Sequence, residues 1–84
     1  MISNQDYLIQ KYSEAREKVQ EANTDTGLNY WRGVMDTYHN LLSTAFEGWA
    51  APDSVGYYVF IEQMTYDEAL RAISMRHLTK SLVS

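Results

Sequence analysis

Residues 28–49, "LNYWRGVMDTYHNLLSTAFEGW", decide the fold of this chain. Their apolar residues recur at alternating intervals of three and four, which is the repeat of one face of an α-helix. The repeat consists of Leu28, Trp31, Met35, Tyr38, Leu42, Ala45 and Trp49, and Val34, Leu41 and Phe46 widen it. The pattern predicts one long amphipathic helix with a tryptophan near each end.

A second amphipathic stretch precedes this helix. Its apolar residues have spacings of four, three, four and three, and charged residues occupy the opposite side. The apolar set is Leu8, Tyr12, Ala15, Val19 and Ala22, and the charged set is Glu14, Glu17, Lys18 and Glu21. We expect Ser3 to cap this helix, with Asp6 three residues later. The turn-forming residues 22–27, "ANTDTG", then join the two helices into an antiparallel hairpin.

The C-terminal part begins with a helix-start signal. Residues 65–68, "TYDE", form a capping box with Thr65 as the N-cap and Glu68 three residues later. The apolar residues that follow fall on two different sides of a helix. The first side holds Tyr66, Ala69, Leu70 and Ile73, and the second holds Met75, Leu78 and Leu82. The pattern therefore predicts a bend near Ser74, or a helix end that docks on something else, such as a second subunit.

Residues 53–64, "DSVGYYVFIEQM", fit either a strand or a helix. Five consecutive aromatic or β-branched residues, 57–61, favour a strand, but no second strand is available to pair with it. As a helix, the segment would turn Tyr57, Phe60, Ile61 and Met64 inward and Ser54, Glu62 and Gln63 outward. Pro52 ends the preceding helix, and Pro52 with Asp53 suits a new helix start. We predict an all-α single domain over residues 1–84, with a single strand at 57–61 as the alternative.

Composition restricts the class of protein. The chain has 84 residues, no cysteine and a net charge of −4, so neither disulfides nor thiolate metal sites support it. Residues 1–68 carry eleven acids against four bases, a balance of −7, which would repel a nucleic-acid backbone. No apolar run reaches the roughly 20 residues of a bilayer crossing, and the start lacks a signal-peptide pattern. We expect a soluble cytoplasmic protein that does not associate with membranes.

Catalytic and cofactor signatures are lacking in the sequence. Asp36 and His39 lie one turn apart on the second helix, but neither HExxH nor any other metal spacing surrounds them. His77 lies near the C-terminus, where a cation complements the helix dipole. The glycines do not cluster into a phosphate-binding loop, and no GxSxG turn occurs. We therefore predict no enzymatic activity, no metal and no cofactor.

Tyrosine is abundant in this chain, with seven among 84 residues. Protein interfaces favour tyrosine, because it buries a large area and keeps a polar tip. Tyr12, Tyr38 and Tyr66 lie on predicted core stripes, whereas Tyr7, Tyr30 and Tyr58, with Phe60, do not fit the core as well. We predict that these four bind a protein partner, with Asp53 and Glu62 steering it.

The favoured function is a small acidic protein-binding module, an inhibitor or adaptor of the phage or mobile-element kind. The alternative is a structural homo-oligomer, such as a homodimer, that assembles through residues 55–64 and through Met75, Leu78 and Leu82. The third hypothesis is a regulator that contacts nucleic acid through Arg71, Arg76 and Lys80.

Overall fold

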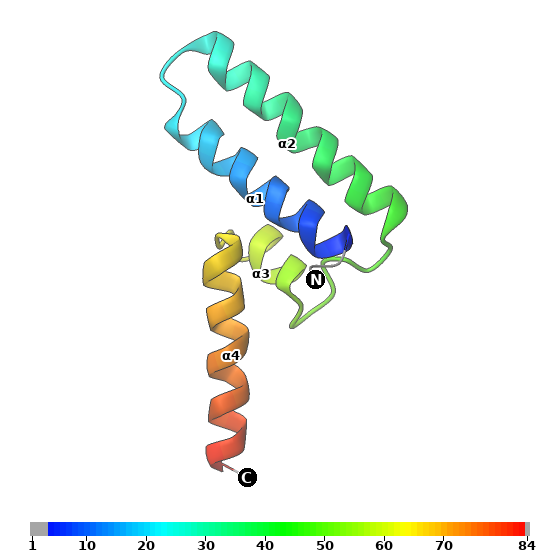
Figure 1. Ribbon diagram of the computed structural model, residues 1–84, viewed down its shortest axis with the longest axis vertical. Helices are drawn as coiled ribbons and strands as arrows, with labels where there is room; N and C mark the ends of the chain where they lie inside the picture. Colours follow the sequence, from blue (N-terminus) through cyan, green and yellow to red (C-terminus); the bar gives the residue numbers. More distant parts are fainter. Residues whose placement is uncertain (1–3, 84) are drawn as a thin grey trace.

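A computed structural model describes the backbone of residues 4–83 and the side chains of residues 4–75. Four helices follow one another: α1 (Asn4–Glu21), α2 (Asp25–Ala45), α3 (Val55–Phe60) and α4 (Tyr66–Val83). The first two form an antiparallel hairpin, α3 lies beside the N-terminal half of α1, and α4 leads away from the hairpin (Figure 1). No strand occurs in residues 4–83, so the predicted all-α class is confirmed. The predicted cap Ser3 lies outside the described residues.

The predicted hairpin of the first two helices is confirmed, but α2 begins and ends earlier than expected. The Thr24 hydroxyl accepts a hydrogen bond from the Gly27 N–H (3.1 Å), so α2 begins at Asp25 rather than near Leu28. It ends at Ala45, shortly before Gly48, which adopts a left-handed conformation with φ 80°. The prediction that α2 continues to Trp49 was therefore wrong. Trp49 leaves the helix and turns back into the core, where it is 5% exposed.

Helix α3 settles the choice between strand and helix at residues 57–61. The Ser54 hydroxyl caps it by accepting from the Tyr57 N–H (3.1 Å), and Val59 is fully buried on its inner side. The predicted inward face was only partly right. Ile61 is 51% exposed, because α3 ends at Phe60 and the chain turns before Ile61 can reach the core.

Arg16 of α1 forms hydrogen bonds that hold the backbone at and after the end of α3 in place. Its guanidinium donates hydrogen bonds to the carbonyl oxygens of Val59 and Met64, which belong to the end of α3 and to the linker before α4. One turn earlier on α1, the buried Ser13 hydroxyl accepts from the Tyr66 N–H (3.0 Å) at the start of α4. Two neighbouring polar residues of α1 therefore position both α3 and α4.

The core lies at the open end of the hairpin, where the first half of α1 and the end of α2 meet the following loop, α3 and the start of α4. Its buried apolar members are Ile9, Tyr12, Leu42, Trp49, Val59 and Ala69. The rings of Phe60 and His39 pack against this cluster, with centroids 4.9 Å apart, and both rings also approach Trp49. Aromatic rings from four separate segments thus fill the centre of this small domain.

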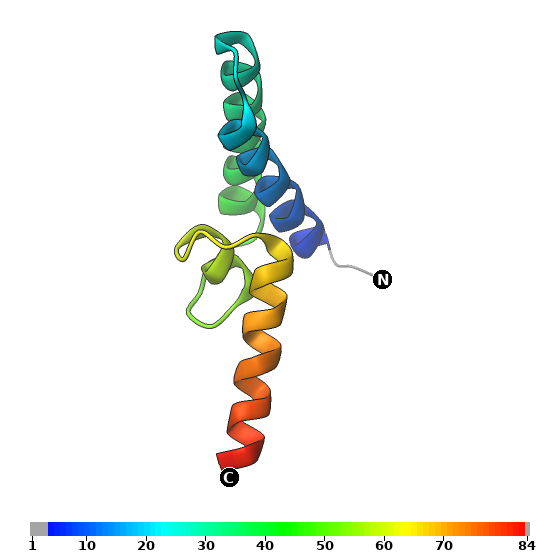
Figure 2. The same cartoon turned by 90° about the vertical axis from the view of Figure 1, so that its left-hand side faces the viewer.

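Helix α4 starts at the predicted capping box. The Thr65 N–H donates to the Glu68 carboxylate (3.1 Å), and the Glu68 N–H donates to the Thr65 hydroxyl (3.2 Å). The helix continues without interruption past Ser74, so the predicted bend near that residue was wrong (Figure 2). Within the described part of the chain, α4 contacts α3 and α1 through its first turns, where Ala69 is fully buried.

Gly56 provides a test of the contact between α3 and the α2–α3 loop. A Cβ added there would lie 1.8 Å from the backbone oxygen of Trp49, so Gly56→Ala must push α3 away from the loop. We expect a loss of about 3 kcal/mol or more in the free energy of unfolding, measured by urea denaturation. Gly33→Ala is the matched control, because nothing lies within 4 Å of its added Cβ, and it should stabilise α2 by about 1 kcal/mol. Equal stability of the two variants would contradict the packing of α3.

Arg16→Met tests the hydrogen bonds that join α1 to the end of α3 and to the linker before α4. Methionine keeps the apolar stem but leaves the carbonyls of Val59 and Met64 without their charged donor. We expect a loss of about 2–4 kcal/mol in urea denaturation. Lys18→Met, an exposed α1 position, is the control and should change stability by less than about 0.5 kcal/mol. An Arg16→Met variant as stable as this control would show that the Arg16 hydrogen bonds do not stabilise the fold.

The capping box makes stability depend on pH. The hydrogen bonds with the Thr65 backbone and hydroxyl lower the pKa of Glu68 below its ordinary value of 4.5. Because the folded-state pKa is the lower one, this stabilisation is present above the ordinary value and is lost as pH falls through the folded pKa. Glu68→Gln should therefore unfold at a lower temperature than the parent chain at neutral pH. The gap should close as pH falls through the folded-state pKa of Glu68, and a gap independent of pH would contradict the assignment.

Candidate functional site

Asp36 and His39, one turn apart on α2, have their side chains in different surroundings. The His39 ring packs into the aromatic cluster, 4.9 Å from Phe60 and 5.8 Å from Trp49, whereas Asp36 is exposed. Within the described residues, no group of three or more His, Cys, Asp or Glu side chains could hold a metal ion. The His77 side chain lies outside the described residues.

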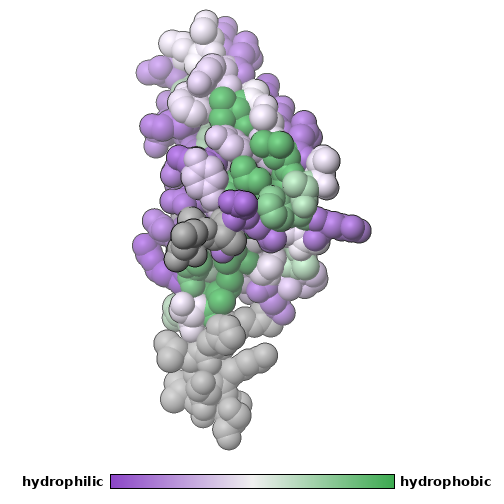
Figure 3. Space-filling model, turned by 45° about the vertical axis from the view of Figure 1, so that its right-hand side comes forward, coloured by the Kyte–Doolittle hydropathy of each residue, from purple (hydrophilic) through white to green (hydrophobic). Residues whose placement is uncertain are grey.

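One side of the hairpin carries exposed and half-buried aromatic and aliphatic side chains, and we call this surface the aromatic face. It consists of Tyr7 and Lys11 from α1, and Tyr30, Val34, Tyr38 and Leu41 from α2. The α2 residues follow one another at intervals of four, four and three, so they share one helix face. Tyr30 is 62% exposed, and Tyr7 and Leu41 are each 46% exposed. Figure 3 shows apolar side chains gathered over the hairpin between hydrophilic borders.

The side chains of Tyr30, Val34 and Tyr38 form a ridge along α2, and a shallow hollow lies on each side of this ridge. One, of about 320 Å³, lies between the helices and has Lys11, Ala15 and Trp31 in its lining. The other, of about 470 Å³, lies on the outer side of α2 beside Gly33. Tyr30, Val34 and Tyr38 line both hollows. An incoming side chain could therefore be buried on either side of this ridge.

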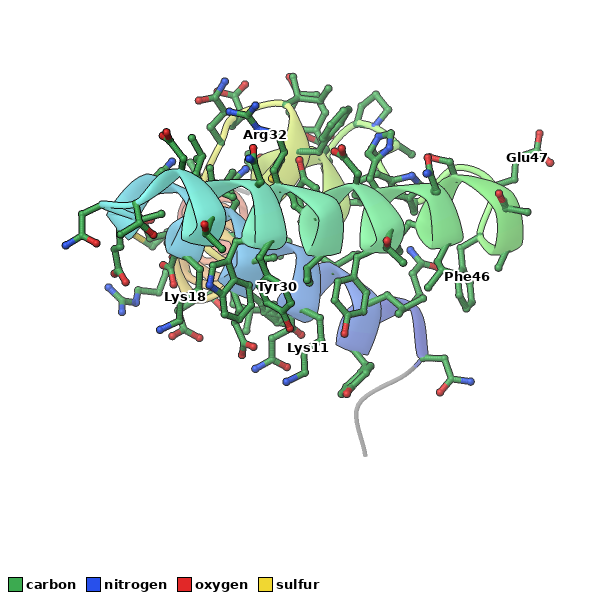
Figure 4. All side chains as sticks on the ribbon, turned by 90° about the horizontal axis from the view of Figure 1, so that it is seen from above. Lys11, Lys18, Tyr30, Arg32, Phe46 and Glu47 are labelled. Carbon is green, nitrogen blue, oxygen red and sulfur yellow. The ribbon has the colours of Figure 1, made fainter. Side chains whose placement is uncertain are left out.

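Charged residues of α1 border the aromatic face. The Lys11 ammonium lies 3.3 Å from the Glu14 carboxylate and 5.5 Å from the centre of the Tyr7 ring. The hydrogen bond with Glu14 raises the pKa of Lys11, so the ammonium keeps its charge at neutral pH. Figure 4 shows Lys11, Tyr30 and Lys18 on the same side of the hairpin, with Arg32 on the opposite side of α2. The aromatic face is thus apolar in the middle and charged along one edge.

A second surface lies around the start and end of α3. The Tyr57 hydroxyl donates a hydrogen bond to Glu62 (3.2 Å), and this bond raises the pKa of Tyr57, with a smaller contribution from Asp53. The Tyr58 ring packs against the Tyr57 ring at 5.5 Å. Two carboxylates and two tyrosines are thus brought together, and the exposed Ile61 lies beside them. We call Asp53, Tyr57, Tyr58 and Glu62 the acidic cluster.

The structure divides the predicted partner-binding residues among three places. Asp53, Glu62 and Tyr58 join the acidic cluster, and Tyr7 and Tyr30 belong to the aromatic face. Phe60 is half-buried and packs against the core, as Tyr58 also does in part. The interface assignment of Phe60 was therefore wrong, whereas the helix interpretation of residues 53–64, which turns Phe60 inward, agrees with the structure.

Sequence reasoning missed several residues of these two surfaces. Val34 and Leu41 were assigned to the buried flank of the second helix, but Leu41 is 46% exposed, since α2 has only α1 to pack against along its length. Tyr57 was assigned to the core, yet its hydroxyl bonds Glu62 at the surface. The five-residue separation of Tyr57 and Glu62 becomes a contact only because α3 ends between them.

The predicted oligomer-interface residues lie on α4. Met75 is 67% exposed, while the side chains of Leu78 and Leu82 lie outside the described residues. Helix α4 therefore presents an exposed surface in the part that can be described, and the role of these three residues remains a prediction.

Comparisons with known proteins complete this description. No protein-family model, no curated protein and no solved structure matches the chain. None of the helices in the described part of the chain has both the length and the hydropathy that a membrane crossing requires.

Proposed function

We propose that this chain is a non-enzymatic protein-binding module, acting as an inhibitor or adaptor, and that it binds its partner through the aromatic face. The exposure of Tyr30, Leu41 and Tyr7 on two adjacent helices carries the proposal. Large apolar side chains that adjoin one another at the surface are typical of interaction sites. Tyrosines of this kind supply much of the binding energy in protein interfaces.

Several side chains of the aromatic face already have a fixed geometry. The Tyr30 ring packs edge to face against Trp31, with centroids 5.0 Å apart, and Lys11 is paired with Glu14. Side chains that are ordered before binding lose less conformational entropy when a partner arrives. This preorganisation supports the assignment of the aromatic face as the main contact surface.

The shape of the aromatic face suits an amphipathic helix of the partner. Two antiparallel helices with a hollow between them can accept a third helix, whose apolar side chains would lie against Tyr30, Val34 and Tyr38. Lys11 and Glu14 at the edge would then pair with charges on the polar flanks of that helix. Such pairs contribute more to orientation than to affinity.

The acidic cluster suits an auxiliary role in binding. Residues 1–68 carry a balance of −7, to which Asp53 and Glu62 contribute. A negative field of this size accelerates encounter with a basic protein surface and opposes contact with a phosphate backbone. The proposed partner is therefore a protein with an exposed apolar helix and a positively charged surface nearby.

Truncation of Tyr30 tests the proposal. A photo-crosslinking amino acid at position 41 would first capture the partner in cells of the source organism, and the partner would then be purified for calorimetry. Tyr30→Ala should weaken its binding by about 30-fold or more, as for an interface residue worth about 2 kcal/mol. Folding should be unaffected, since Tyr30 is 62% exposed.

Arg32→Ala is the matched control, because Arg32 is exposed on the opposite side of α2 (Figure 4). It should leave binding within about twofold of the parent chain. If Tyr30→Ala binds as tightly as Arg32→Ala, the aromatic face is not the contact surface.

A further inference from the structure

We propose that residues 55–61 act as a conformational switch. They form α3 and its first following residue in the folded chain, and once this helix opens they extend into a β-strand that pairs with the same segment of a second copy. The segment lies outside the aromatic face, so the proposal goes beyond the proposed function and can fail without it. Its support comes from the composition of α3, the backbone at both ends of α3, and the contacts that hold α3 in place.

The residues of α3 suit a strand better than a helix. Residues 55–61, "VGYYVFI", contain six aromatic or β-branched residues and no charge. Such residues are enriched in strands, and the glycine among them weakens a helix. Uncharged segments of about six or seven residues with this composition pair readily with copies of themselves. Helix α3 is six residues long, and a helix this short is marginal without packing. The local sequence therefore favours an extended segment, and the surrounding structure stabilises the helix.

The backbone on both sides of α3 is strained. Asp53 has φ 69° and Gln63 has φ 58°, and in the described part of the chain these two are the non-glycine residues with positive φ. The left-handed conformation is unfavourable for a residue with a Cβ, and glutamine adopts it less readily than aspartate. Gln63 occupies it because α3 ends in a turn in which the Met64 N–H donates to the Tyr58 carbonyl (3.0 Å), and glycine is usual at this place. An extended segment would let both residues return to ordinary backbone conformations.

Contacts with other elements hold α3 in its helical form. Arg16 of α1 donates hydrogen bonds to the carbonyls of Val59 and Met64. The Val59 side chain is fully buried, and Gly56 lies directly against the Trp49 backbone. The hairpin does not depend on these contacts, because α1 and α2 have 18 and 21 residues and pack against each other (Figure 1). Helix α3 can therefore open while the hairpin stays folded.

A second copy supplies the strand that the opened segment requires. A lone strand leaves its backbone donors and acceptors unpaired. No strand occurs in residues 4–83, so the described chain offers none for pairing. The same segment of another copy is equally uncharged and equally rich in aromatic and β-branched side chains. Two such segments can pair through their backbones and pack these side chains across the strands.

Hydrogen exchange of the full chain tests the opening of α3. The Val59 amide should exchange at least about tenfold faster than the Leu42 amide of α2, although both side chains are fully buried. Gln63→Gly removes the cost of the left-handed conformation and should slow exchange at Val59 by about fivefold. Gln63→Ala is the matched control, since alanine keeps a Cβ, and it should leave the rate within about twofold of the parent rate. Exchange at Val59 as slow as at Leu42, or equal effects of the two substitutions, would overturn the proposal.

Infrared spectroscopy of the assembled chain tests the strand. In mild urea that opens α3 and leaves the hairpin helical, the parent chain should assemble and show the amide I band of strands paired between chains. Ile61→Lys places a charge in the uncharged segment and should slow assembly at least about tenfold. Leu41→Lys is the matched control, because Leu41 is 46% exposed and Ile61 is 51% exposed. It should assemble within about twofold of the parent rate.

The same variants separate this proposal from the proposed function. Leu41 belongs to the aromatic face, so Leu41→Lys should weaken binding of the partner and leave assembly unchanged, whereas Ile61→Lys should do the opposite. Equal slowing of assembly by the two lysine substitutions would overturn the switch. So would assemblies without the strand band, or a chain that stays unassembled where hydrogen exchange shows that α3 has opened.

Discussion

The arrangement of the last third of this protein depends on one side chain of the first helix. Arg16 bonds the carbonyls of Val59 and Met64, which lie on either side of the end of α3. A six-residue helix is too short to be stable alone, so it needs contacts of this kind to hold its position. With α3 fixed, its Gly56 sits directly against the Trp49 backbone and Val59 closes the core. The direction of α4 follows, because Ser13 on the same face of α1 bonds its first N–H.

The core also determines which aromatic residues remain available for binding. Tyr12, Trp49, Phe60 and His39 come from four segments and pack on one another. Tyr30 and Tyr7 instead lie on the outer side of the hairpin and are exposed, whereas Tyr38 is half-buried beside the core. A hairpin of two helices can bury only one face of each helix, so the other faces stay in solvent. Among the described residues, no further helix covers the aromatic face.

Charged residues are distributed unevenly along the chain. Residues 1–68 carry eleven acids and four bases, whereas the three residues after Glu68 that carry a charge at neutral pH are all basic. The proposed partner, with positive charge near its apolar helix, would complement the negative field of the first 68 residues.

The sequence by itself determined the elements whose information is local. The repeat of threes and fours specified the hairpin, and "TYDE" specified the start of α4, because periodicity and capping depend on neighbours within a few residues. Only the tertiary structure decided the rest. The return of Trp49 to the core after Gly48, the contact of Tyr57 with Glu62 and the placement of α3 and α4 against α1 all appear only in the structure. The placement depends on contacts between residues distant in sequence, such as Arg16 with Val59 and Met64, and such contacts have no periodicity that a single sequence could reveal.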